Sequence, residues 1–378
     1  MAYPVLIAAL LCFALFLHPY VSYPLSIRLM RTRPVTPNPQ APLPSAALFF
    51  SAYNEERALP DKIANLEAIK ARHPDIAIYA YDDMSSDSTR AILLSRPDLI
   101  TLVPSTERTG KATGMRLMVA QASADICIFT DANVILAPES VAPLLNIFRD
   151  PKVGGVSGKL RYINDADSMT ANVGGLYWRL EEHIKAQESR CGSMMGADGS
   201  IFATRRALYP EVPAHLLDDM TVSTSVMFHG LRLVSGDGVI AYEKSTTSSA
   251  DEFRRKRRIA CRAFNTHRFL WPQIKRHFPL VDIYKYVSHK LLRWFGAPLL
   301  AAGIALLTAG LLLAGAAKLA LGLWLAGGIA LLLGYVARFG PFAALSEILT
   351  SIIATFIGVI DALSGKTYQT WAPAKSRD

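Results

Sequence analysis

Apolar segments at both ends of this chain constrain its fold more than any other feature. The first runs from Tyr3 to Ile27, and three more lie at about 295–316, 319–337 and 341–363. Each is about long enough to cross the hydrocarbon core of a bilayer. The first has no basic leader and no small-residue cleavage site, so a retained anchor is favoured over a cleaved signal peptide. The sequence therefore predicts membrane spans on either side of a polar region.

The placement of basic residues orients these segments. The net charge is +9, and Arg28, Arg31 and Arg33 directly follow the first segment. By the positive-inside rule, they place the next region in the cytoplasm. Because basic residues cluster beside the apolar ends, we do not expect nucleic-acid binding. Four spans would leave the basic tail outside, against the same rule, and an interfacial or re-entrant last segment would remove this conflict.

This pattern also predicts how the chain is divided. Four cysteines without a C-x-x-C pair indicate neither a disulfide framework nor a zinc site, which favours a reducing compartment. We expect an N-terminal transmembrane anchor (1–30), a linker (31–44), a catalytic domain (45–275), an interfacial amphipathic helix (276–294), transmembrane helices (295–365) and a tail (366–378).

Short apolar runs alternate with helical segments between residue 46 and about residue 160. Strands are predicted at 46–51, 76–81, 99–103 and 153–158 and over the first half of 126–133. Such alternation predicts an α/β domain with a parallel sheet. The chain is less regular afterwards, with a long helical stretch and two more strand regions at 168–190, 201–204 and 231–242.

Polar residues stand at the ends of these predicted strands, where an open α/β sheet binds its ligands. Asp131 and Asn133 follow one strand, Asp82 and Asp83 end another, and Lys111 opens a helix. Oxygen ligands beside a lysine suit a divalent cation that carries a nucleotide diphosphate. An Asx turn, plain helix capping and a solvated lysine remain alternatives for the single residues. Neither G-x-G-x-x-G nor a P-loop is present.

Two further polar features lie in the second half of the polar region. Gly196 to Ser200 form a glycine-rich loop that would let a ligand approach the backbone closely. Asp218 and Asp219 precede a predicted helix. Because adjacent acids raise one another's pKa, one of them could act as a general base. A helix cap is an equal alternative for this pair.

A basic run occupies the helix predicted after the last strand. Arg255, Arg258 and Arg262 share one face of that helix. A row of guanidinium groups could hold a diphosphate by bidentate hydrogen bonds. The same face could instead rest on anionic lipid.

Taken in order, these residues resemble the inverting family 2 glycosyltransferases, whose catalytic domain has the GT-A fold. The likeness covers about residues 44–294, and it is strongest to the membrane-bound branch of cellulose, poly-N-acetylglucosamine and hyaluronan synthases. It implies an α/β, Rossmann-like GT-A domain with flanking transmembrane helices.

On the donor side, the resemblance implies a role for each motif. Asn54 and Glu55, in Tyr53-Asn54-Glu55-Glu56, would lie beside the nucleoside, and Asp83 would contact the uridine. Lys111 matches the donor contact in a Gly-Lys pair. Asp131 and Asn133 match the D-x-D motif and would hold manganese or magnesium. From the residues alone, Asn54 could also cap a helix running to about Lys70.

On the acceptor side, the loop from Gly196 to Ser200, with Asp198, resembles the lining of the acceptor site. Asp218-Asp219 stands where the family has Thr-Glu-Asp, so Asp219 would be the general base. Arg255 to Ile259 stands where the family has Q-x-x-R-W, with Arg258 on the arginine. Ser288-His289-Lys290 resembles the family's interfacial-helix motif.

Several positions depart from the family pattern. Asn133 replaces the second aspartate of D-x-D, which removes a charge from the metal site. Arg255 replaces the glutamine and Ile259 the tryptophan of Q-x-x-R-W, and the tryptophan helps processive synthases to hold the growing polymer. The spans are also fewer than in the large polymer synthases. These departures put processivity and a self-formed export channel in doubt.

The resemblance implies an integral, multi-pass enzyme of the inner or plasma membrane, with its catalytic domain in the cytoplasm. It would transfer a sugar from a nucleotide sugar, a UDP-sugar, to a glycan or lipid-linked acceptor, in contact with membrane lipids and with an unknown export partner. One alternative is a non-processive transferase to a polyprenyl-phosphate or ceramide-like lipid. Others are an inactive nucleotide-sensing subunit of a secretion complex and a transporter, whose polar residues should lie within the spans.

Overall fold

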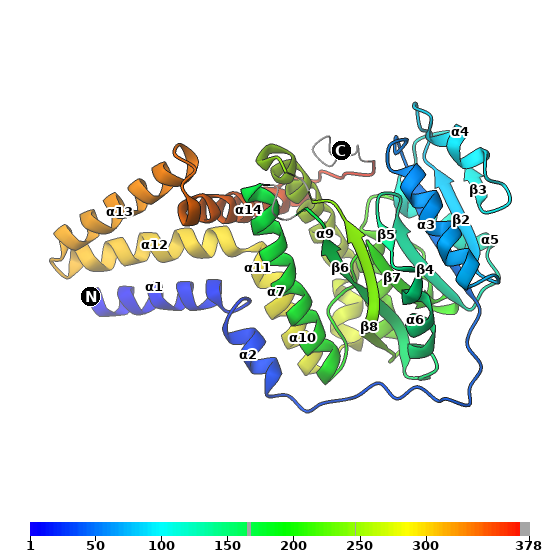
Figure 1. Ribbon diagram of the computed structural model, residues 1–378. Helices are drawn as coiled ribbons and strands as arrows, with labels where there is room; N and C mark the ends of the chain where they lie inside the picture. The colour runs from blue at the N-terminus through cyan, green and yellow to red at the C-terminus, as the bar shows by residue number, and fades with distance from the viewer. Residues whose placement is uncertain (165–167, 246, 371–378) are drawn as a thin grey trace.

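A bundle of apolar helices and an α/β domain lie at opposite ends of this computed structural model, which describes residues 1–164, 168–245 and 247–370 (Figure 1). The expected linker has no helix or strand and follows one side of the α/β domain (Figure 1). It is bound there, because the backbone N–H of Arg33 donates to Arg190 O over 2.8 Å. The guanidinium of Arg232 also donates to the carbonyl oxygens of Arg33 and Pro34.

One mixed sheet of eight strands forms the centre of the α/β domain, in the order β3-β2-β1-β4-β7-β6-β8-β5. Its strands are β1 (Ala46–Ala52), β2 (Ala77–Asp82), β3 (Thr101–Pro104), β4 (Ile126–Asp131), β5 (Ile135–Leu136), β6 (Val153–Tyr162), β7 (Ile201–Arg205) and β8 (Arg232–Glu243).

The predicted parallel sheet is confirmed for the half of the sheet that β1 to β4 form. Strands β1 to β4 pair in parallel, and β6 pairs in parallel with β8. Strand β7 is antiparallel to both β4 and β6 and separates them, which the sequence did not predict. Because β7 is antiparallel to both of its neighbours, β6 runs in the same direction as β4. Strand β8 is parallel to β6, so the carboxyl ends of β4, β6 and β8 lie at the same edge of the sheet.

Alternate residues of the central strand β1 pack into two cores, one on each face of the sheet. Leu48 and Phe50 belong to one core, and Ala47 and Phe49 belong to the other. This follows from the two-residue period of a strand. A strand that is buried on both faces reads as a continuous apolar run, which is why β1 could be recognised in the sequence.

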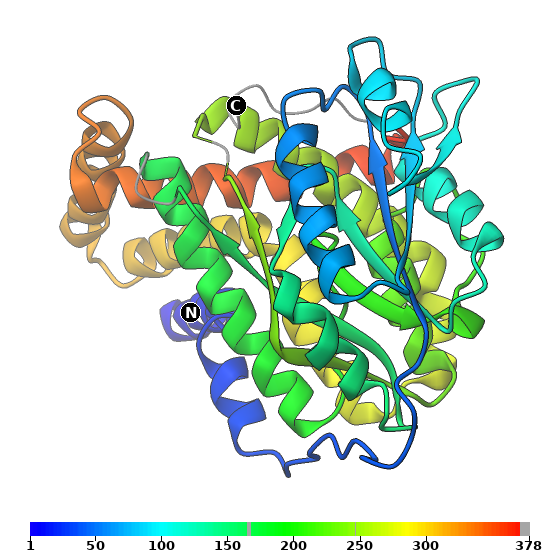
Figure 2. The same cartoon turned by 45° about the vertical axis from the view of Figure 1, so that its right-hand side comes forward.

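Helices cover both faces of the sheet (Figures 1 and 2). They are α3 (Leu59–Arg72), α4 (Thr89–Leu94), α5 (Lys111–Gln121), α6 (Val141–Ile147), α7 (Met169–Cys191), α8 (Asp218–Phe228) and α9 (Ser249–His277), with short 3₁₀ turns at Pro138–Ser140 and Arg206–Leu208.

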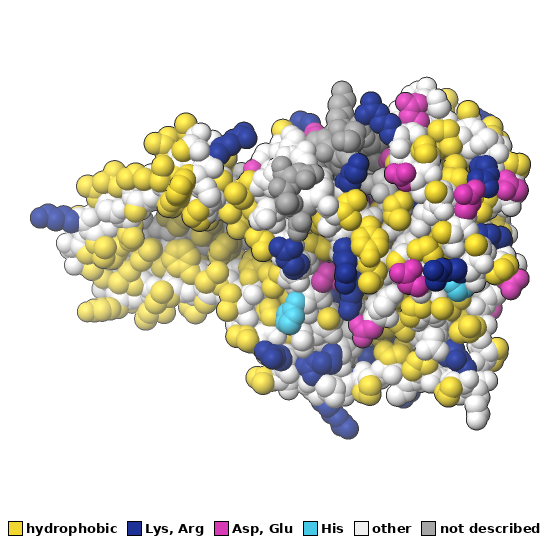
Figure 3. Space-filling view, in the orientation of Figure 1, with side chains coloured by type: hydrophobic (Ala, Val, Ile, Leu, Met, Phe, Trp, Pro, Cys, Tyr) yellow, Lys and Arg dark blue, Asp and Glu magenta, His cyan; other side chains and the backbone are white. Residues whose placement is uncertain are grey.

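The apolar helices at the other end are α1 (Ala2–Leu17), α2 (Ser22–Arg28), α12 (Gly296–Leu313), α13 (Ala317–Tyr335) and α14 (Gly340–Leu363). Within the described residues, α12, α13 and α14 are long and apolar enough to cross a membrane, and the pair α1 and α2, bent by 60°, would be a fourth span. Hydrophobic side chains cover this end of the surface (Figure 3). Such a surface suits a lipid environment.

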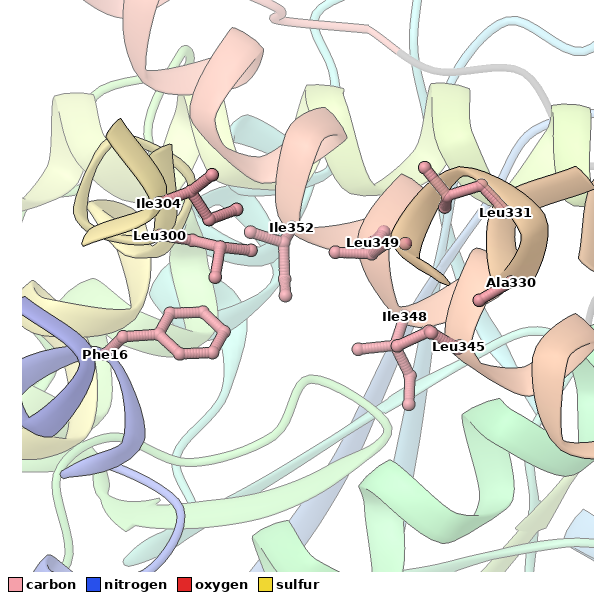
Figure 4. Close-up of a pocket in the computed structure, with 10 residues that line it drawn as sticks. Phe16, Leu300, Ile304, Ala330, Leu331, Leu345, Ile348, Leu349 and Ile352 are labelled. Carbon is pink, nitrogen blue, oxygen red and sulfur yellow. The ribbon is translucent and has the colours of Figure 1, made fainter. Parts of the chain in front are cut away.

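An apolar cavity of about 380 Å³ lies among these helices (Figure 4). Phe16 of α1, Leu300 of α12, Ala330 of α13 and Ile352 of α14 are among the residues that line it. Its lining contributes no polar surface. Alkyl chains of lipid can fill such a space, and it offers no group for chemistry.

Helix α14 ends against the α/β domain. Gly358 of α14 packs on α9, where a Cβ at this position would lie 2.8 Å from the Ala260 Cβ. Asp361 accepts hydrogen bonds of 2.6 and 3.0 Å from Arg257 of α9. Beyond the helix, the Gln369 amide donates to Thr109 O over 3.1 Å. The segment that follows α14 therefore lies against the α/β domain.

The expected interfacial helix consists of α10 (Leu280–Tyr286), a π-helical turn (Val287–Leu291) and α11 (Leu292–Trp294). Its polar groups face the protein. Both ring nitrogens of the buried His289 contact carboxylates of α7, those of Glu188 at 2.8 Å and Glu181 at 2.9 Å. Lys285 donates to Ser193 O over 2.7 Å. These basic side chains hold the segment to α7 and to the residues that directly follow it.

Candidate active site

Loops that carry the predicted site residues meet at one edge of the sheet. The carboxyl ends of β1, β2, β4, β6 and β8 lie at this edge, and the glycine-rich loop enters β7 from it. Helices α5 and α8 begin at Lys111 and Asp218. This is the position at which open α/β sheets bind ligands.

Lys111 lies at the centre of the site. Its Nζ is 2.6 Å from Asp131 Oδ1 and 3.6 Å from Asp218 Oδ2. Burial lowers the pKa of Lys111, but the carboxylates of Asp131, Asp218 and Asp219 together raise it well above its usual value. The lysine therefore stays charged, and it offsets the repulsion between carboxylates that come from different loops.

Asn133 binds a carboxylate that the sequence analysis did not select. Its amide donates to Glu243 Oε1 over 3.1 Å, and Ser200 Oγ donates to Glu243 Oε2 over 3.4 Å. Glu243 is buried at the end of β8. An acidic residue that closes an apolar strand was the available signal in the sequence, the same signal that pointed to Asp131.

The loop after Asp131 is fixed by the neighbouring helix α3. The buried Lys62 donates from Nζ to Val134 O over 2.6 Å. Asn65 and Leu136 exchange two hydrogen bonds, of 2.7 and 3.0 Å, through the side-chain amide and the main chain. Burial lowers the pKa of Lys62 to about 7. These bonds fix the loop backbone and with it the direction of the Asp131 side chain.

Asp83 holds the loop that enters α5. Its Oδ1 accepts hydrogen bonds from the backbone N–H of Thr109, at 2.8 Å, and of Gly110, at 3.0 Å. Its buried Oδ2 has no hydrogen bond within the described residues and lies 3.7 Å from Arg108 Nε. The Arg108 guanidinium covers the ring of Tyr53, 3.3 Å from its centroid. The Asp83 side chain thus has one bound oxygen and one oxygen without a hydrogen bond.

The turn around Asn54 differs from our expectation. Helix α3 begins at Leu59, five residues beyond Asn54, so Asn54 does not cap it. Asn54 has a left-handed backbone, with φ of 53°, and its Oδ1 accepts from the Ser86 N–H over 2.8 Å. The N–H of Glu55 donates to Thr89 Oγ1 over 2.8 Å. These bonds join the turn after β1 to the turn after β2, which explains the run of hydroxyl residues after Asp83.

Asp218 and Asp219 occupy the first turn of α8, whose positive end favours carboxylates. Asp219 Oδ1 accepts from the Met220 N–H over 2.6 Å. Burial and the adjacent Asp218 carboxylate raise the pKa of Asp219 to about 6, against the opposing charge of Lys111. A Cβ on Gly199 would lie 3.0 Å from Asp219 Oδ2, so the glycine leaves room beside this carboxylate.

The glycine-rich loop is held from both sides. Gly196 has a φ of +99°, a conformation that favours glycine. The N–H of Ala197 donates to Ser223 Oγ of α8 over 2.9 Å. Asp198 Oδ1 accepts from the Ser200 N–H over 2.9 Å, whereas its buried Oδ2 has no hydrogen bond within the described chain.

The arginines of α9 border the site on another side. Arg255 pairs with Glu252 at 3.3 Å. Arg262 donates to the carbonyl oxygen of Leu216, just before α8. Arg258 lies between Arg255 and Arg262 on this face by helical spacing. The row therefore extends from the neighbourhood of Glu252 to the start of α8.

A family model described as glycosyl transferase family 2 matches residues 48–212. This chain carries a family 2 glycosyltransferase domain. The matched residues include β1 to β4, the Asp131 loop and the glycine-rich loop, and they end before Asp218 and the arginines of α9.

Two curated relatives match about half of the chain. An N-acetylglucosaminyltransferase of Rhizobium meliloti (strain 1021) is 25% identical over 212 residues, which are 53% of this chain and 49% of the relative. A poly-beta-1,6-N-acetyl-D-glucosamine synthase of Staphylococcus aureus (strain COL) is 25% identical over 199 residues, which are 50% of this chain and 48% of the relative. The chain therefore spans about half the length of these relatives.

A solved structure is similar over nearly the whole chain. It is a mannosyltransferase from Pyrobaculum calidifontis in complex with GDP-Man and Mn²⁺, with a TM-score of 0.71 and 22% identity. The likeness covers 96% of this chain and 99% of that chain. It shows that the α/β domain has the GT-A fold, as the sequence predicted.

The structure brings together most residues that the sequence selected in the glycosyltransferase domain. Lys111, Asp131, Asp218 and Asp219 form one cluster. The Asn54 side chain instead connects the turns after β1 and β2, and its Oδ1 accepts a hydrogen bond from Ser86. The binding and catalytic roles of these residues remain predictions. Glu243 and Lys62 were missed because their importance depends on partners that are distant in the chain.

Proposed function

We propose that the chain is a membrane-anchored inverting glycosyltransferase that moves a sugar from a UDP-sugar to a glycan or lipid-linked acceptor in envelope or extracellular polysaccharide synthesis. The observation that supports this most is the meeting of Lys111 with the carboxylates of Asp131 and Asp218 at one sheet edge. This set supplies a cation for a diphosphate, an oxygen ligand for a metal and, in the adjacent Asp219, a base. The two N-acetylglucosamine-transferring relatives make UDP-N-acetylglucosamine the first donor to test.

The donor diphosphate would bind between Lys111 and a divalent cation, Mn²⁺ or Mg²⁺. Asp131, the amide oxygen of Asn133 and Glu243 would hold that cation. In the described chain, no group of three or more His, Cys, Asp or Glu side chains could hold a metal. Such a partial set fits a cation that takes further ligands from donor phosphates and water. The bound cation would offset charge on the departing diphosphate, and the mannosyltransferase of the same fold was solved with Mn²⁺.

The nucleoside would lie over the turns after β1 and β2. The Asp83 Oδ2 atom lacks a hydrogen bond within the described chain, so it can accept one from an N–H of the base. Because Asp83 Oδ1 holds Thr109 and Gly110, base binding is tied to the loop that presents Lys111. Asn54 would act by fixing these turns.

Asp219 would take the proton from the acceptor hydroxyl as that oxygen attacks the anomeric carbon from the face opposite the diphosphate. Its raised pKa suits this role, because a base near neutral pH removes a proton most effectively. Lys111, with Arg255 and Arg258, would stabilise negative charge on the leaving diphosphate. In this scheme each group acts on the charge that develops in the transition state.

We also propose that the catalytic domain faces the cytoplasm. Arg28, Arg31 and Arg33 lie where α2 meets the linker, and Arg254 and Lys256 lie on α9 beside α14. Basic residues beside apolar helices indicate the cytoplasmic face. This orientation gives the site access to cytoplasmic nucleotide sugars.

The deciding experiment measures UDP release by the detergent-purified protein across a panel of UDP-sugars, with and without Mn²⁺, in the presence of membrane lipid. We expect metal-dependent release from one donor. Release from GDP-mannose alone would replace the donor class. No release from any donor, with UDP still bound, would contradict the enzyme and favour a nucleotide-sensing subunit.

A further inference from the structure

One face of helix α7 borders the candidate active site and has no role in the scheme above. Gly175, Trp178, Glu182 and Lys185 share this face by helical spacing. The Trp178 ring meets the ring of Tyr162 edge to face, with centroids 6.0 Å apart. Tyr162 ends β6 and pairs in register with Glu243, the residue that binds Asn133. The face therefore begins beside the proposed donor site.

A cavity of about 260 Å³ lies between the end of β6 and this face. It is lined by Leu160, Arg161, Tyr162, Gly175, Trp178 and Arg179. Unlike the cavity of Figure 4, its lining is both polar and apolar. Its volume equals that of several water molecules, at about 30 Å³ each. The cavity thus has room for a small polar group or a sugar ring.

Three enclosed polar atoms along this path have no hydrogen-bond partner within the described residues: Trp178 Nε1, Glu182 Oε1 and Asp198 Oδ2. Lys185 is only 4% exposed, and its Nζ lies 3.8 Å from Glu182 Oε1, too far for a hydrogen bond. Buried polar groups in folded proteins are nearly always satisfied. Trp178, which carries one of these atoms, also lines the cavity, so an unsatisfied donor there indicates a polar ligand.

The glycine-rich loop connects this face to the proposed base. Asp198 precedes Gly199, where an added Cβ would lie 3.0 Å from Asp219 Oδ2. Burial lowers the pKa of Lys185, but Asp198 and the nearby glutamates raise it above its usual value overall. Asp198 also raises the pKa of Glu182, after burial itself. The N–H of Asp198 also donates to Ser157 Oγ of β6 over 3.4 Å, and the end of the same strand packs on Trp178 through Tyr162. The path therefore runs from Asp219 past Asp198 and along β6 to Trp178.

The chemistry of this path favours an uncharged polyhydroxyl ligand. Burial is the main reason that the pKa of Glu182 rises to about 7, so this group can donate or accept a hydrogen bond near neutral pH. Lys185 is balanced by Asp198 and Glu182, and its Nζ covers the Trp178 ring at 4.6 Å. Mixed donors and acceptors around an aromatic ring suit sugar hydroxyls and the apolar face of a sugar. A site for an anion would not contain the acidic side chains of Glu182 and Asp198, because carboxylates repel anions.

We propose that the α7 face of Trp178, Glu182 and Lys185, with Asp198, is the acceptor subsite and that it takes a sugar residue of a glycan. This inference rests on the proposed function, because it places the glycan hydroxyl beside Asp219. It selects a glycan over a lipid phosphate as the group bound next to the base. The glycan enters along α7, and the donor enters from the turns after β1 and β2.

The test compares oligosaccharide binding with donor turnover in the full-length, detergent-purified protein. Trp178→Phe removes the indole N–H, and Glu182→Gln removes the charge while keeping the shape. The matched controls are Trp324→Phe, in the lipid-facing helix α13, and Glu211→Gln, at the exposed surface. A short β-1,6-linked N-acetylglucosamine oligosaccharide is titrated by calorimetry into UDP-saturated protein. UDP-sugar hydrolysis is measured in parallel without acceptor.

We expect the oligosaccharide Kd to rise about five- to tenfold in each test variant and to stay unchanged in the controls, since one hydrogen bond is lost. Acceptor-free hydrolysis should stay at the parent level in the two control variants. Parent-like binding in both test variants would overturn the subsite. Parent protein that hydrolyses a UDP-sugar but binds no oligosaccharide would also overturn it and leave the proposed function standing. Binding lost in both variants, in a protein that hydrolyses no donor, would support the subsite and contradict the proposed function.

Discussion

Lys111 Nζ lies 2.6 Å from Asp131 Oδ1, so the lysine occupies the side of the carboxylate where a cation would bind. The same Nζ is 3.6 Å from Asp218 Oδ2, on a different element. Removing Lys111 would leave the buried Asp218 carboxylate without this cation. The lysine therefore connects the proposed metal ligand to Asp218, the residue next to the proposed base.

Asp131→Ala should weaken metal-dependent UDP binding by more than about tenfold, because loss of a metal-binding carboxylate costs at least as much as loss of its supporting groups. UDP titrations with and without Mn²⁺ measure this effect. Asp237→Ala is the matched control, because the Asp237 side chain is 96% exposed and pairs with Lys159 at the surface. Equal UDP affinity in the Asp131 variant and the parent, at every Mn²⁺ concentration, would move the metal elsewhere.

Asp219→Asn should lower sugar transfer on the order of 10²–10⁴-fold, the usual cost of removing a positioned base. UDP binding should persist, because Asp131 and Lys111 remain. Single-turnover transfer and UDP titration on the same preparation separate the two effects. Transfer at the parent rate would exclude Asp219 as the base.

The rate should depend on pH through Asp219. Burial, followed by the Asp218 carboxylate, raises the pKa of Asp219 to about 6. The base is active as the carboxylate, so kcat/KM should be level above that pH and fall about tenfold per unit below it. Asp218→Asn removes one cause of the raised pKa, so its acid limb should move to lower pH. Superimposed acid limbs in the two proteins would contradict this coupling.

The local sequence pattern predicted strands β1 to β4, but it could not predict the order in which the strands of the sheet pair. The run Ala46–Ala52 is apolar throughout because β1 is buried on both faces. The insertion of β7 between β4 and β6 depends on contacts between strands that are distant in the chain, and no local period encodes it. The acids after β2 and β4 were informative because parallel strands bring their ends to one edge.

The same limit explains which site residues were misjudged or missed. Asn54 has a typical capping side chain, but its partner is Ser86, in the next turn of the fold. Lys62 lies in an amphipathic helix, where a lysine is usually exposed, and only the carbonyl of Val134 makes its burial favourable. The α7 face becomes a candidate subsite only because the ends of β6 and β8 lie beside it.

The position of the residues after α14 gives a prediction about topology. Gln369 contacts Thr109, so this segment should be on the catalytic side of the membrane. Thr367→Cys and Ala71→Cys should therefore react with an impermeant maleimide from the same side, and Ala314→Cys, at the turn between α12 and α13, from the opposite side. Cys12→Ser provides the background, because the other three cysteines are buried. Thr367→Cys and Ala314→Cys reacting from one side would contradict the return of α14 to the catalytic domain.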